Sequence, residues 1–185
     1  MMPGKTIFTG KTKKNRRITI RYAKKQDARL MLDYINTLSK EKTFIIFQGE
    51  LISFKDEKKY LDSFFSQMKK NEAVKLLAFH GKELVGVADV RLKDRNTDHI
   101  GRFGLTVAKN FRNEGIGKLL MKLTLEEARK NIKKLRIIDL SVFANNTIAQ
   151  RMYHKRFGFK KYGCLPKGIR HRSKFVDDIL MYKEV

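Results

Sequence analysis

A short glycine-containing segment, residues 112–118 (Arg-Asn-Glu-Gly-Ile-Gly-Lys), has the residue types of a phosphate-binding loop. It follows a strand-like stretch, Ile100–Val107, and it opens a segment, 116–130, whose apolar residues have helical spacing. The first turn of a helix leaves four backbone N–H groups without an intrahelical partner, and the helix dipole favours an anion there. Glycine lets the backbone approach a phosphate closely. We therefore expect a phosphate at this loop, with Arg112 and Lys118 adding positive charge.

Two common nucleotide-binding motifs do not fit this loop. A Walker loop continues Gly-Lys with Ser or Thr, whereas Leu119 follows Lys118 here. A Rossmann loop needs three spaced glycines and an acid about twenty residues further on, and only two glycines are present. Taken alone, the segment leaves open a strand-to-helix turn that binds nothing.

A second group of residues, Asn146, Ala149 and Tyr153, is spaced i, i+3 and i+7. On a helix these positions lie on one face, and Tyr153 stands about 10 Å along the axis from Asn146. Asn146 occupies the place of a helix cap. A polar group, a small residue and a phenol would then line one side of a groove. The alternative is a cap, a packing alanine and a core tyrosine.

Together the two segments resemble motifs A and B of the GNAT acetyltransferases. Motif A is Arg/Gln-x-x-Gly-x-Gly/Ala after a strand ending in Val, and motif B is a strand, Asn, Ala, Tyr and then Gly-Phe, here Gly158-Phe159. The resemblance, which covers roughly residues 18–182, implies that strand and loop hold acetyl-CoA and that Tyr153 is catalytic, facing the departing sulfur. The cofactor-binding residues that it implies are Leu105, Thr106, Val107, Arg112, Asn113, Glu114, Gly115, Ile116, Gly117, Lys118 and Asn146.

The resemblance implies an N-acetyltransferase, in which a primary amine attacks the acetyl group of acetyl-CoA directly. The segment 174–181 resembles the final strand of members that acetylate amino acids or protein N-termini, so the expected acceptor is an amino acid, a small amine or a protein N-terminus. An alkyl amine titrates near pH ~10.4 and an α-amine near ~8, so a general base helps the first more than the second. Backbone N–H groups of residues 105–107 are expected to stabilise the developing oxyanion.

The general base is the open part of this interpretation. Many N-terminal acetyltransferases of the superfamily carry a Glu on the strand before motif B, where this chain has Ser141. The candidates are Glu50, Asp89, His99 or an ordered water. Each of the three side chains is also compatible with a structural or solvated role. No metal-ligand spacing is present among the four histidines and the single cysteine, Cys164.

The charge of the chain offers a competing hypothesis. With 42 Lys and Arg against 19 Asp and Glu, the net charge is +23, and no acid precedes Asp27. Such a surface attracts polyanions. The alternative function is therefore a non-catalytic basic protein of the GNAT fold that binds RNA or the ribosome; a regulatory acetyl-CoA sensor is a third possibility. A single cysteine and the absence of a long apolar run favour a cytoplasmic protein without membrane association, either a monomer or a homodimer.

The apolar patterns predict one α/β domain, residues 17–185, preceded by a disordered basic tail, residues 1–16. Strands are expected at residues 18–22, 74–79, 84–92, 100–107, 136–143, 159–164 and 176–182, and helices at 26–38, from Ser53 onward, 116–130 and 146–157. The expected fold class is α/β, with a GNAT-like mixed, mostly antiparallel central sheet flanked by helices. The sheet should be splayed between the strands that carry motifs A and B.

Overall fold

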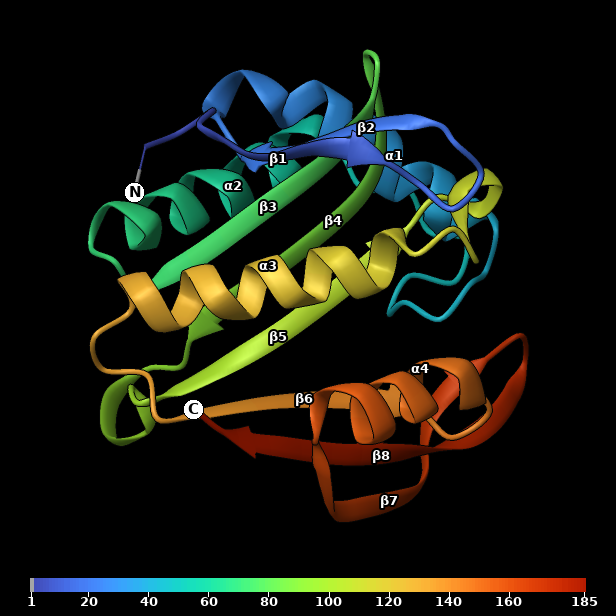
Figure 1. The fold of residues 1–185 in the computed structure, drawn as a ribbon. Coiled ribbons are helices and arrows are strands. Elements are labelled where there is room, and N and C mark those ends of the chain that lie inside the picture. The colour runs from blue at the N-terminus through green and yellow to red at the C-terminus, as the bar shows by residue number, and fades with distance from the viewer. Residues whose placement is uncertain (1) are drawn as a thin grey trace.

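A single eight-stranded sheet organises the chain in the computed structural model, which describes residues 2–185 (Figure 1). The strand order is β1-β2-β3-β4-β5-β6-β8-β7. The strands are β1 (Thr6–Lys11), β2 (Arg17–Tyr22), β3 (Ala73–His80), β4 (Glu83–Leu92), β5 (Ile100–Val107), β6 (Ile137–Phe143), β7 (Lys160–His171) and β8 (Lys174–Glu184). The helices are α1 (Ala28–Lys40), α2 (Phe54–Lys69), α3 (Ile116–Asn131) and α4 (Thr147–Arg151). No helix in the described range is long and apolar enough to cross a membrane.

The sheet is antiparallel except between β5 and β6, which run parallel and pair only from Ile100–Arg102 to Ile137–Asp139. Beyond those residues the two strands diverge, and Figure 1 shows the resulting gap between the β1–β5 part and the β6–β8 part. The fold class predicted from the sequence, including the splay between the motif A and motif B strands, is confirmed.

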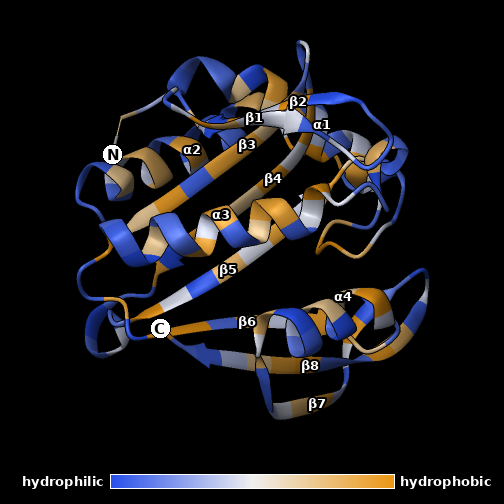
Figure 2. Ribbon diagram, viewed as in Figure 1, coloured by the Kyte–Doolittle hydropathy of each residue, from blue (hydrophilic) through white to orange (hydrophobic). Residues whose placement is uncertain are grey.

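Helices cover both faces of the central strands. Helix α3 packs on β3, β4 and β5, whereas α1 contacts β4 and α2 contacts β3. In Figure 1, α3 crosses the face nearest the viewer, and α1 and α2 lie behind the same strands. A strand covered on both sides is buried all along its length rather than at alternate positions. This explains the run of buried residues in β3, and Figure 2 shows the hydrophobic colour concentrated on the central strands.

The N-terminal segment differs from the prediction of a disordered tail over residues 1–16. Residues Thr6–Lys11 form β1, an edge strand that pairs antiparallel with β2. An edge strand has a neighbour on one side only, and half of β1 is exposed, so its sequence lacks the apolar alternation that marks inner strands. The β1–β2 turn is tied to residues 112–118, the expected phosphate loop, about a hundred residues away, because Thr12 and Arg16 donate hydrogen bonds to Glu114. These contacts order the segment.

Two C-terminal elements also differ in extent from their predictions. The helix expected over residues 146–157 is α4 followed by one π-helical turn, Met152–Arg156. The last two strands, expected at residues 159–164 and 176–182, extend toward each other into one long hairpin. Its turn is formed by Arg172 and Ser173, both at positive φ, a conformation that sequence pattern does not reveal for non-glycine residues.

Candidate active site

Two cavities meet at the gap beside β5, and both are lined by Leu105 and Thr106. The first, here called the basic cavity, has a volume of about 570 Å³ and includes Lys13, Phe44, Arg112, Gly117, Asn146 and Tyr153. The second, here called the acidic cavity, has a volume of about 600 Å³ and includes Met31, Asp56, Glu57, Tyr60, Lys75 and Asp89. The point where they meet lies on the strand whose sequence predicted cofactor binding.

The phosphate loop has the geometry that its glycines predict. Gly115 is the N-cap of α3 with φ of 89°, in the left-handed region where a side chain is strained. No side chain of the described residues caps this helix. Its first N–H groups and its dipole are therefore directed at the basic cavity. No Asp or Glu lines that cavity in residues 2–185, whereas Lys13, Arg112 and Lys118 do.

Gly117 brings α3 close to β5. A Cβ added at this position would lie 3.5 Å from a methyl group of Val107 and 3.8 Å from one of Leu105. A side chain at position 117 would therefore fill the space between the start of α3 and the edge of β5. This is a cradle of the kind that a phosphate and an extended chain require.

The backbone of β5 presents polar groups to the gap. Residues of a strand alternate the side to which their N–H and C=O groups point. Because the Ala108 N–H donates to Val85 O on the β4 side, at 2.9 Å, the groups of Leu105 and Val107 point to the other side. The Val107 carbonyl indeed accepts a hydrogen bond from Arg112 Nε at 3.0 Å on that side. Leu105 and Val107 therefore direct N–H groups toward the gap.

Arg112 is engaged by the protein itself. Besides its bond to Val107, its Nη2 donates to Glu41 Oε2 at 2.7 Å, at the end of α1. The guanidinium thus joins α1, β5 and the loop and orients the loop. It also lines the basic cavity, so its charge contributes to the local field.

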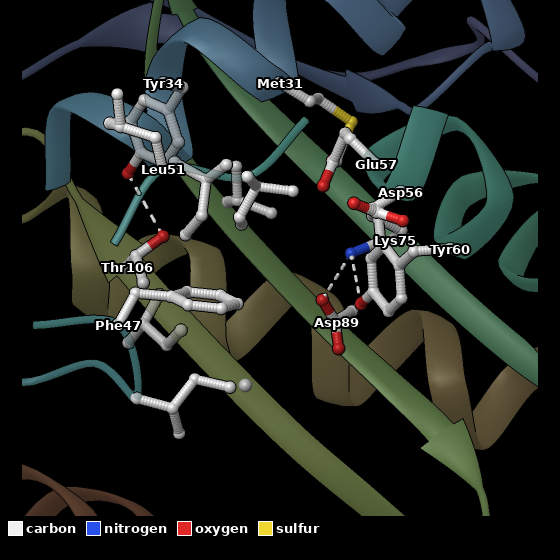
Figure 3. A pocket seen from close by; sticks show the side chains of 16 residues that line it. Met31, Tyr34, Phe47, Leu51, Asp56, Glu57, Tyr60, Lys75, Asp89 and Thr106 are labelled. Carbon is white, nitrogen blue, oxygen red and sulfur yellow. Dashed lines mark hydrogen bonds and ion pairs between the residues drawn. The ribbon is translucent and has the colours of Figure 1, made fainter. Parts of the chain in front are cut away.

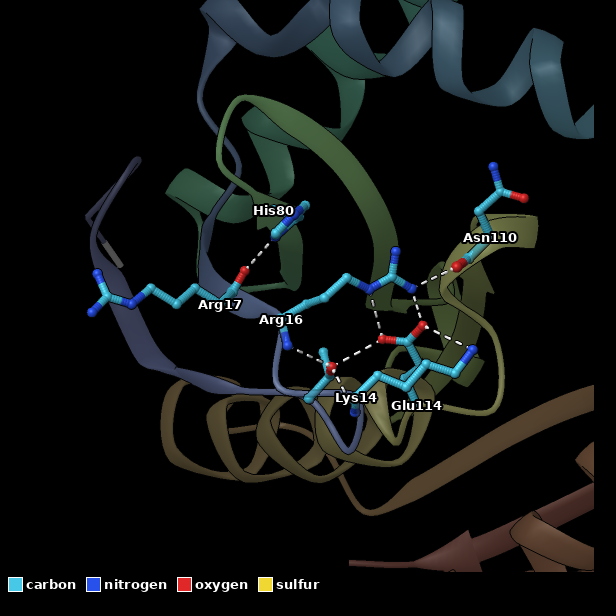
Figure 4. A network of polar contacts seen from close by, with 7 residues as sticks. Lys14, Arg16, Arg17, His80, Asn110 and Glu114 are labelled. Carbon is cyan, nitrogen blue, oxygen red and sulfur yellow. Dashed lines mark hydrogen bonds and ion pairs between the residues drawn. The ribbon is translucent and has the colours of Figure 1, made fainter.

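Glu114 and Ile116 point away from the basic cavity. Ile116 belongs to the core, and the Glu114 side chain is buried against the β1–β2 turn (Figure 4). Glu114 accepts from Thr12 Oγ1 at 2.9 Å and from Arg16 Nε at 3.0 Å, and it forms an ion pair with Arg16. At these two positions only the backbone faces the place where the sequence puts a ligand.

The β1–β2 turn places Lys13 at the phosphate loop, a contribution that the sequence analysis missed. The Lys13 N–H donates to the Glu114 carbonyl at 3.1 Å. Its side chain lies along the loop, because a Cβ on Gly115 would be 3.8 Å from Lys13 Cγ and Cε. No signal near the loop could have revealed this cation, since it lies on the turn that follows β1, a strand that the sequence pattern did not predict.

Asn146, Ala149 and Tyr153 all line the basic cavity, as their spacing predicted. The Asn146 side chain caps α4 by accepting from the Ala149 N–H at 3.2 Å. Tyr153 lies in the π-helical turn, packs edge-on against Phe103 and is buried. Burial raises the pKa of Tyr153 to about 12, so the phenol keeps its proton at neutral pH. Its hydroxyl has no hydrogen-bond partner among residues 2–185 and remains available to a ligand.

The acidic cavity contains a buried ion pair between neighbouring strands (Figure 3). Lys75 of β3 donates to Asp89 Oδ2 of β4 at 2.6 Å and to the Tyr60 hydroxyl of α2 at 3.4 Å. Burial by itself would lower the pKa of Lys75, but the Asp89 carboxylate and the Tyr60 oxygen outweigh it, so the pKa lies above its usual value. Lys75 is therefore charged and neutralised by Asp89.

Glu57 is the unexpected residue of this cavity. Only 6% of it is exposed, and its side chain forms no hydrogen bond or ion pair within the part of the chain that the structure describes. Burial raises the pKa of its carboxyl, which the charge of Lys75 partly offsets. A signal for Glu57 was present in the sequence, because it occupies the same helical stripe as the buried Leu61, Phe64 and Met68.

The three base candidates from the sequence occupy very different places. Asp89 lines the acidic cavity. Glu50 is exposed on the α1–α2 loop, where it accepts from the Gln48 N–H, and it lines neither cavity. His99 precedes β5 at the opposite end of the strand, where its carbonyl accepts from Arg136. The structure therefore brings only Asp89 of the three to a cavity and adds Glu57.

The junction of the cavities carries a hydroxyl pair and a loop that covers it. Tyr34 of α1 donates to Thr106 Oγ1 at 3.1 Å, and burial raises the pKa of that phenol. The α1–α2 loop, residues 41–53, lines both cavities. His171 of the β7–β8 hairpin holds this loop, because its ring contacts Phe44 and its Nε2 lies 3.1 Å from the Lys42 carbonyl.

Comparison with known proteins gives matches in sequence and in fold. An L-amino acid N-acetyltransferase of Escherichia coli (strain K12) is 30% identical over 93 residues, which are 50% of this chain and 56% of that protein. The match thus spans little more than half of that relative. A GNAT-family acetyltransferase from Streptococcus pneumoniae superposes with a TM-score of 0.81 and 28% identity, over 91% of this chain and 99% of that one.

Two further solved structures share the fold at lower identity. A ribosomal-protein-alanine N-acetyltransferase from Brucella melitensis has a TM-score of 0.77 at 23% identity, over 90% of this chain and 99% of its own. An acetyltransferase from Salmonella typhimurium, solved with acetyl-CoA, has a TM-score of 0.77 at 15% identity, over 90% and 93%. The sequence model described as the acetyltransferase (GNAT) family matches residues 33–159, well over half of the chain. The protein is therefore a member of the GNAT acetyltransferase family.

Proposed function

We propose that the protein transfers an acetyl group from acetyl-CoA to a primary amine that attacks it directly. The observation that carries this proposal is the meeting of two cavities of opposite charge at the gap beside β5. A basic cavity suits the phosphates of acetyl-CoA, and an acidic one suits an ammonium group. Family membership and the fold shared with an acetyl-CoA complex support the choice of donor.

Acetyl-CoA supplies the activated acyl group, and the residues of the basic cavity fit it. The uncapped N-terminus of α3, with Lys13 and Lys118 beside it, is suited to hold phosphates. The free edge of β5 offers the N–H groups of Leu105 and Val107 to an extended amide chain and to a carbonyl oxygen that gains negative charge. The remaining residues proposed for this role are Thr106, Arg112, Asn113, Gly115, Gly117 and Asn146, with Glu114 and Ile116 acting through their backbone.

Tyr153 is proposed to donate a proton to the departing sulfur. A thiol of the cysteine type titrates near about 8.5, well below the raised pKa of Tyr153, about 12. The phenol is therefore protonated whenever a thiolate leaves, and it can donate a hydrogen bond to the sulfur. Because the phenol is the weaker acid of the two, transfer of its proton to the sulfur is completed when water reprotonates the tyrosinate. On the other side of the gap, Asp89, Glu57 or a water held between them would accept the proton of the amine.

The test of the proposed function is acetyl transfer to a panel of amines. The purified protein is incubated with acetyl-CoA and with amino acids, small amines and N-terminal peptides, and both free thiol and acetylated amine are measured. The panel follows from the named relatives, one of which acts on L-amino acids and another on a ribosomal protein. Stoichiometric thiol and acetylated product are expected. Failure of every amine, with acetyl-CoA bound, would overturn the enzymatic proposal.

The net charge of +23 supports one other candidate function, binding of RNA or the ribosome by a basic protein of this fold. It requires no turnover. Titration of labelled RNA at several salt concentrations distinguishes it, because affinity that depends on phosphate contacts falls steeply with salt. Tight RNA binding together with absent acetyl-CoA binding would favour this second function over the first.

A further inference from the structure

We propose that the acidic cavity accepts a primary ammonium group on an apolar body that bears no free carboxylate, and that Glu57 binds this ammonium. The inference rests on the proposed function, because it names the chemistry of the acceptor for the same reaction. Hydrophobic amines, amino-acid amides and the N-terminal residue of a peptide chain all fit this description. It excludes free amino acids as preferred acceptors.

The charge of the cavity opposes that of the whole chain. Three carboxylates line it, those of Asp56, Glu57 and Asp89, against one ammonium, that of Lys75. This concentration of negative charge occurs in a protein with an excess of 23 positive charges. A cationic ligand that is repelled by the general surface is attracted locally at this place.

Glu57 is a largely buried residue whose carboxyl lines the cavity and has no hydrogen-bond or ion-pair partner among the described residues. Buried carboxylates are normally paired or hydrogen-bonded, because an uncompensated charge in an apolar site is costly. Lys75 is bonded to Asp89 instead, at 2.6 Å. An incoming ammonium would supply the missing cation for Glu57. Figure 3 shows the Glu57 carboxyl directed toward the same space as Asp89 and the Tyr60 hydroxyl.

The rest of the cavity wall is apolar, and part of it belongs to exposed side chains. Helix α1 contributes Met31 and Ile35, and the α1–α2 loop contributes Ile46 and Leu51, which are 84% and 62% exposed. Exposed apolar side chains gathered at one mouth are typical of a binding site. The ammonium of the acceptor should therefore be attached to an apolar group that covers these side chains.

The cavity has no cation for a free carboxylate. Among the residues of the described chain that line it, Lys75 is the only Lys or Arg, and Asp89 neutralises it. The carboxylate of a free amino acid would lie within a few ångströms of its own ammonium and so near Asp56, Glu57 or Asp89. Like charges in a partly buried site repel strongly. Replacing that carboxylate with an amide removes the repulsion.

The first experiment measures binding, without turnover, by calorimetry at pH 7 with saturating CoA present. L-Phenylalaninamide and L-phenylalanine are compared on the wild type, on Glu57→Gln and on Asp62→Asn. Asp62 lies on the same helix, is exposed and pairs with Lys25, so it is a matched carboxyl-to-amide control. We expect the amide to bind at least tenfold more tightly than the amino acid. Glu57→Gln should weaken the amide about tenfold, and Asp62→Asn should leave it unchanged.

The second experiment measures acetylation of the same ligands, which separates the inference from the function on which it rests. Expected binding without acetylation would overturn the proposed function and leave the ligand chemistry standing. Equal or faster acetylation and binding of L-phenylalanine would overturn the inference and leave the acetyltransferase standing. An unchanged affinity in Glu57→Gln would remove Glu57 from the proposal. The same two measurements on 2-phenylethylamine and on a peptide that begins with Phe show whether a small amine or a peptide N-terminus is the better acceptor.

Discussion

The two cavities beside β5 differ in the way that the chain builds them. The basic cavity is organised around one contiguous piece, strand β5, its loop and α3, so its residues can be recognised by their order along the chain. The acidic cavity takes its lining from several separate segments, namely α1, the α1–α2 loop, α2, β3, β4 and β5. A local motif thus builds the cavity proposed for the acetyl donor, and tertiary packing builds the cavity proposed for the acceptor amine. Substitutions in one cavity should leave the ligand of the other unaffected.

The largest expected effect is on the basic cavity, from Gly117→Glu. The new side chain would enter the cradle over β5 and place a negative charge where phosphates are proposed to bind. Calorimetry should detect no acetyl-CoA binding. Gly117→Ala is the graded control, because its Cβ meets Val107 at an ordinary 3.5 Å and the fold should tolerate it. Normal acetyl-CoA affinity in the glutamate variant would contradict the proposed phosphate site.

On the acidic side, Asp89→Asn should lower the free energy of unfolding by about 3–5 kcal/mol, because it leaves the buried Lys75 ammonium without its partner. The measurement is denaturant unfolding followed by circular dichroism. The double variant Lys75→Met/Asp89→Asn should recover most of the loss, since it removes both charges. A single variant as stable as the wild type would mean that Lys75 is neutralised by another group.

The next largest effect is expected on turnover, from Tyr153→Phe in the basic cavity. Tyr153→Phe keeps the ring and its packing but removes the only proton that the residue can donate, so kcat should fall about a hundredfold. The KM for acetyl-CoA should change little. The pKa of Tyr153, about 12, also predicts no loss of kcat from this residue as pH rises from 6 to 10, since it stays protonated below its pKa. An unchanged kcat would assign Tyr153 to packing.

The smallest expected effect tests whether Lys13, at the edge of the basic cavity, contributes to acetyl-CoA binding. Lys13→Ala should weaken acetyl-CoA binding roughly two- to fivefold at low salt and less at high salt, as expected for one partly exposed charge near a phosphate. Lys11→Ala is the matched control, because Lys11 is an exposed lysine of the neighbouring strand that lines neither cavity. Equal effects of the two substitutions would show that net charge, not position, acts on the cofactor.

The sequence predicted the residues that line the basic cavity better than the contacts that hold those residues in place. Most residues of motifs A and B line one cavity, because strand, loop and helix follow each other directly and their geometry is local. Arg112 illustrates the limit of this reasoning. Its place in the loop was correct, but its bonds to Glu41 and Val107 depend on where α1 ends relative to β5. The residues near Arg112 in the sequence do not specify the position of α1 relative to β5.

The features that the sequence did not predict, or predicted wrongly, all depend on contacts between distant parts of the chain. Strand β1 was overlooked because an edge strand needs little apolar alternation, and its ordering contact with Glu114 spans about a hundred residues. Glu57 was overlooked although it stands in the apolar stripe of α2, because periodicity shows that a position is buried but not what it faces. Glu50 was a candidate base because it lies between the two N-terminal helices, and His99 because an imidazole there precedes β5. The fold places both outside the cavities.

The sequence by itself determined the fold class, the glycine-containing loop at the start of α3 and the tyrosine-bearing helix, because each depends on hydrogen bonds and side-chain spacing within a short segment. Only the tertiary structure decided that the N-terminal turn supplies Lys13, that Lys75 and Asp89 neutralise each other, and that Glu57 has no partner among residues 2–185. These features arise where separate elements pack together. The free energy of a buried charge depends on every group around it, and sequence order does not place those groups.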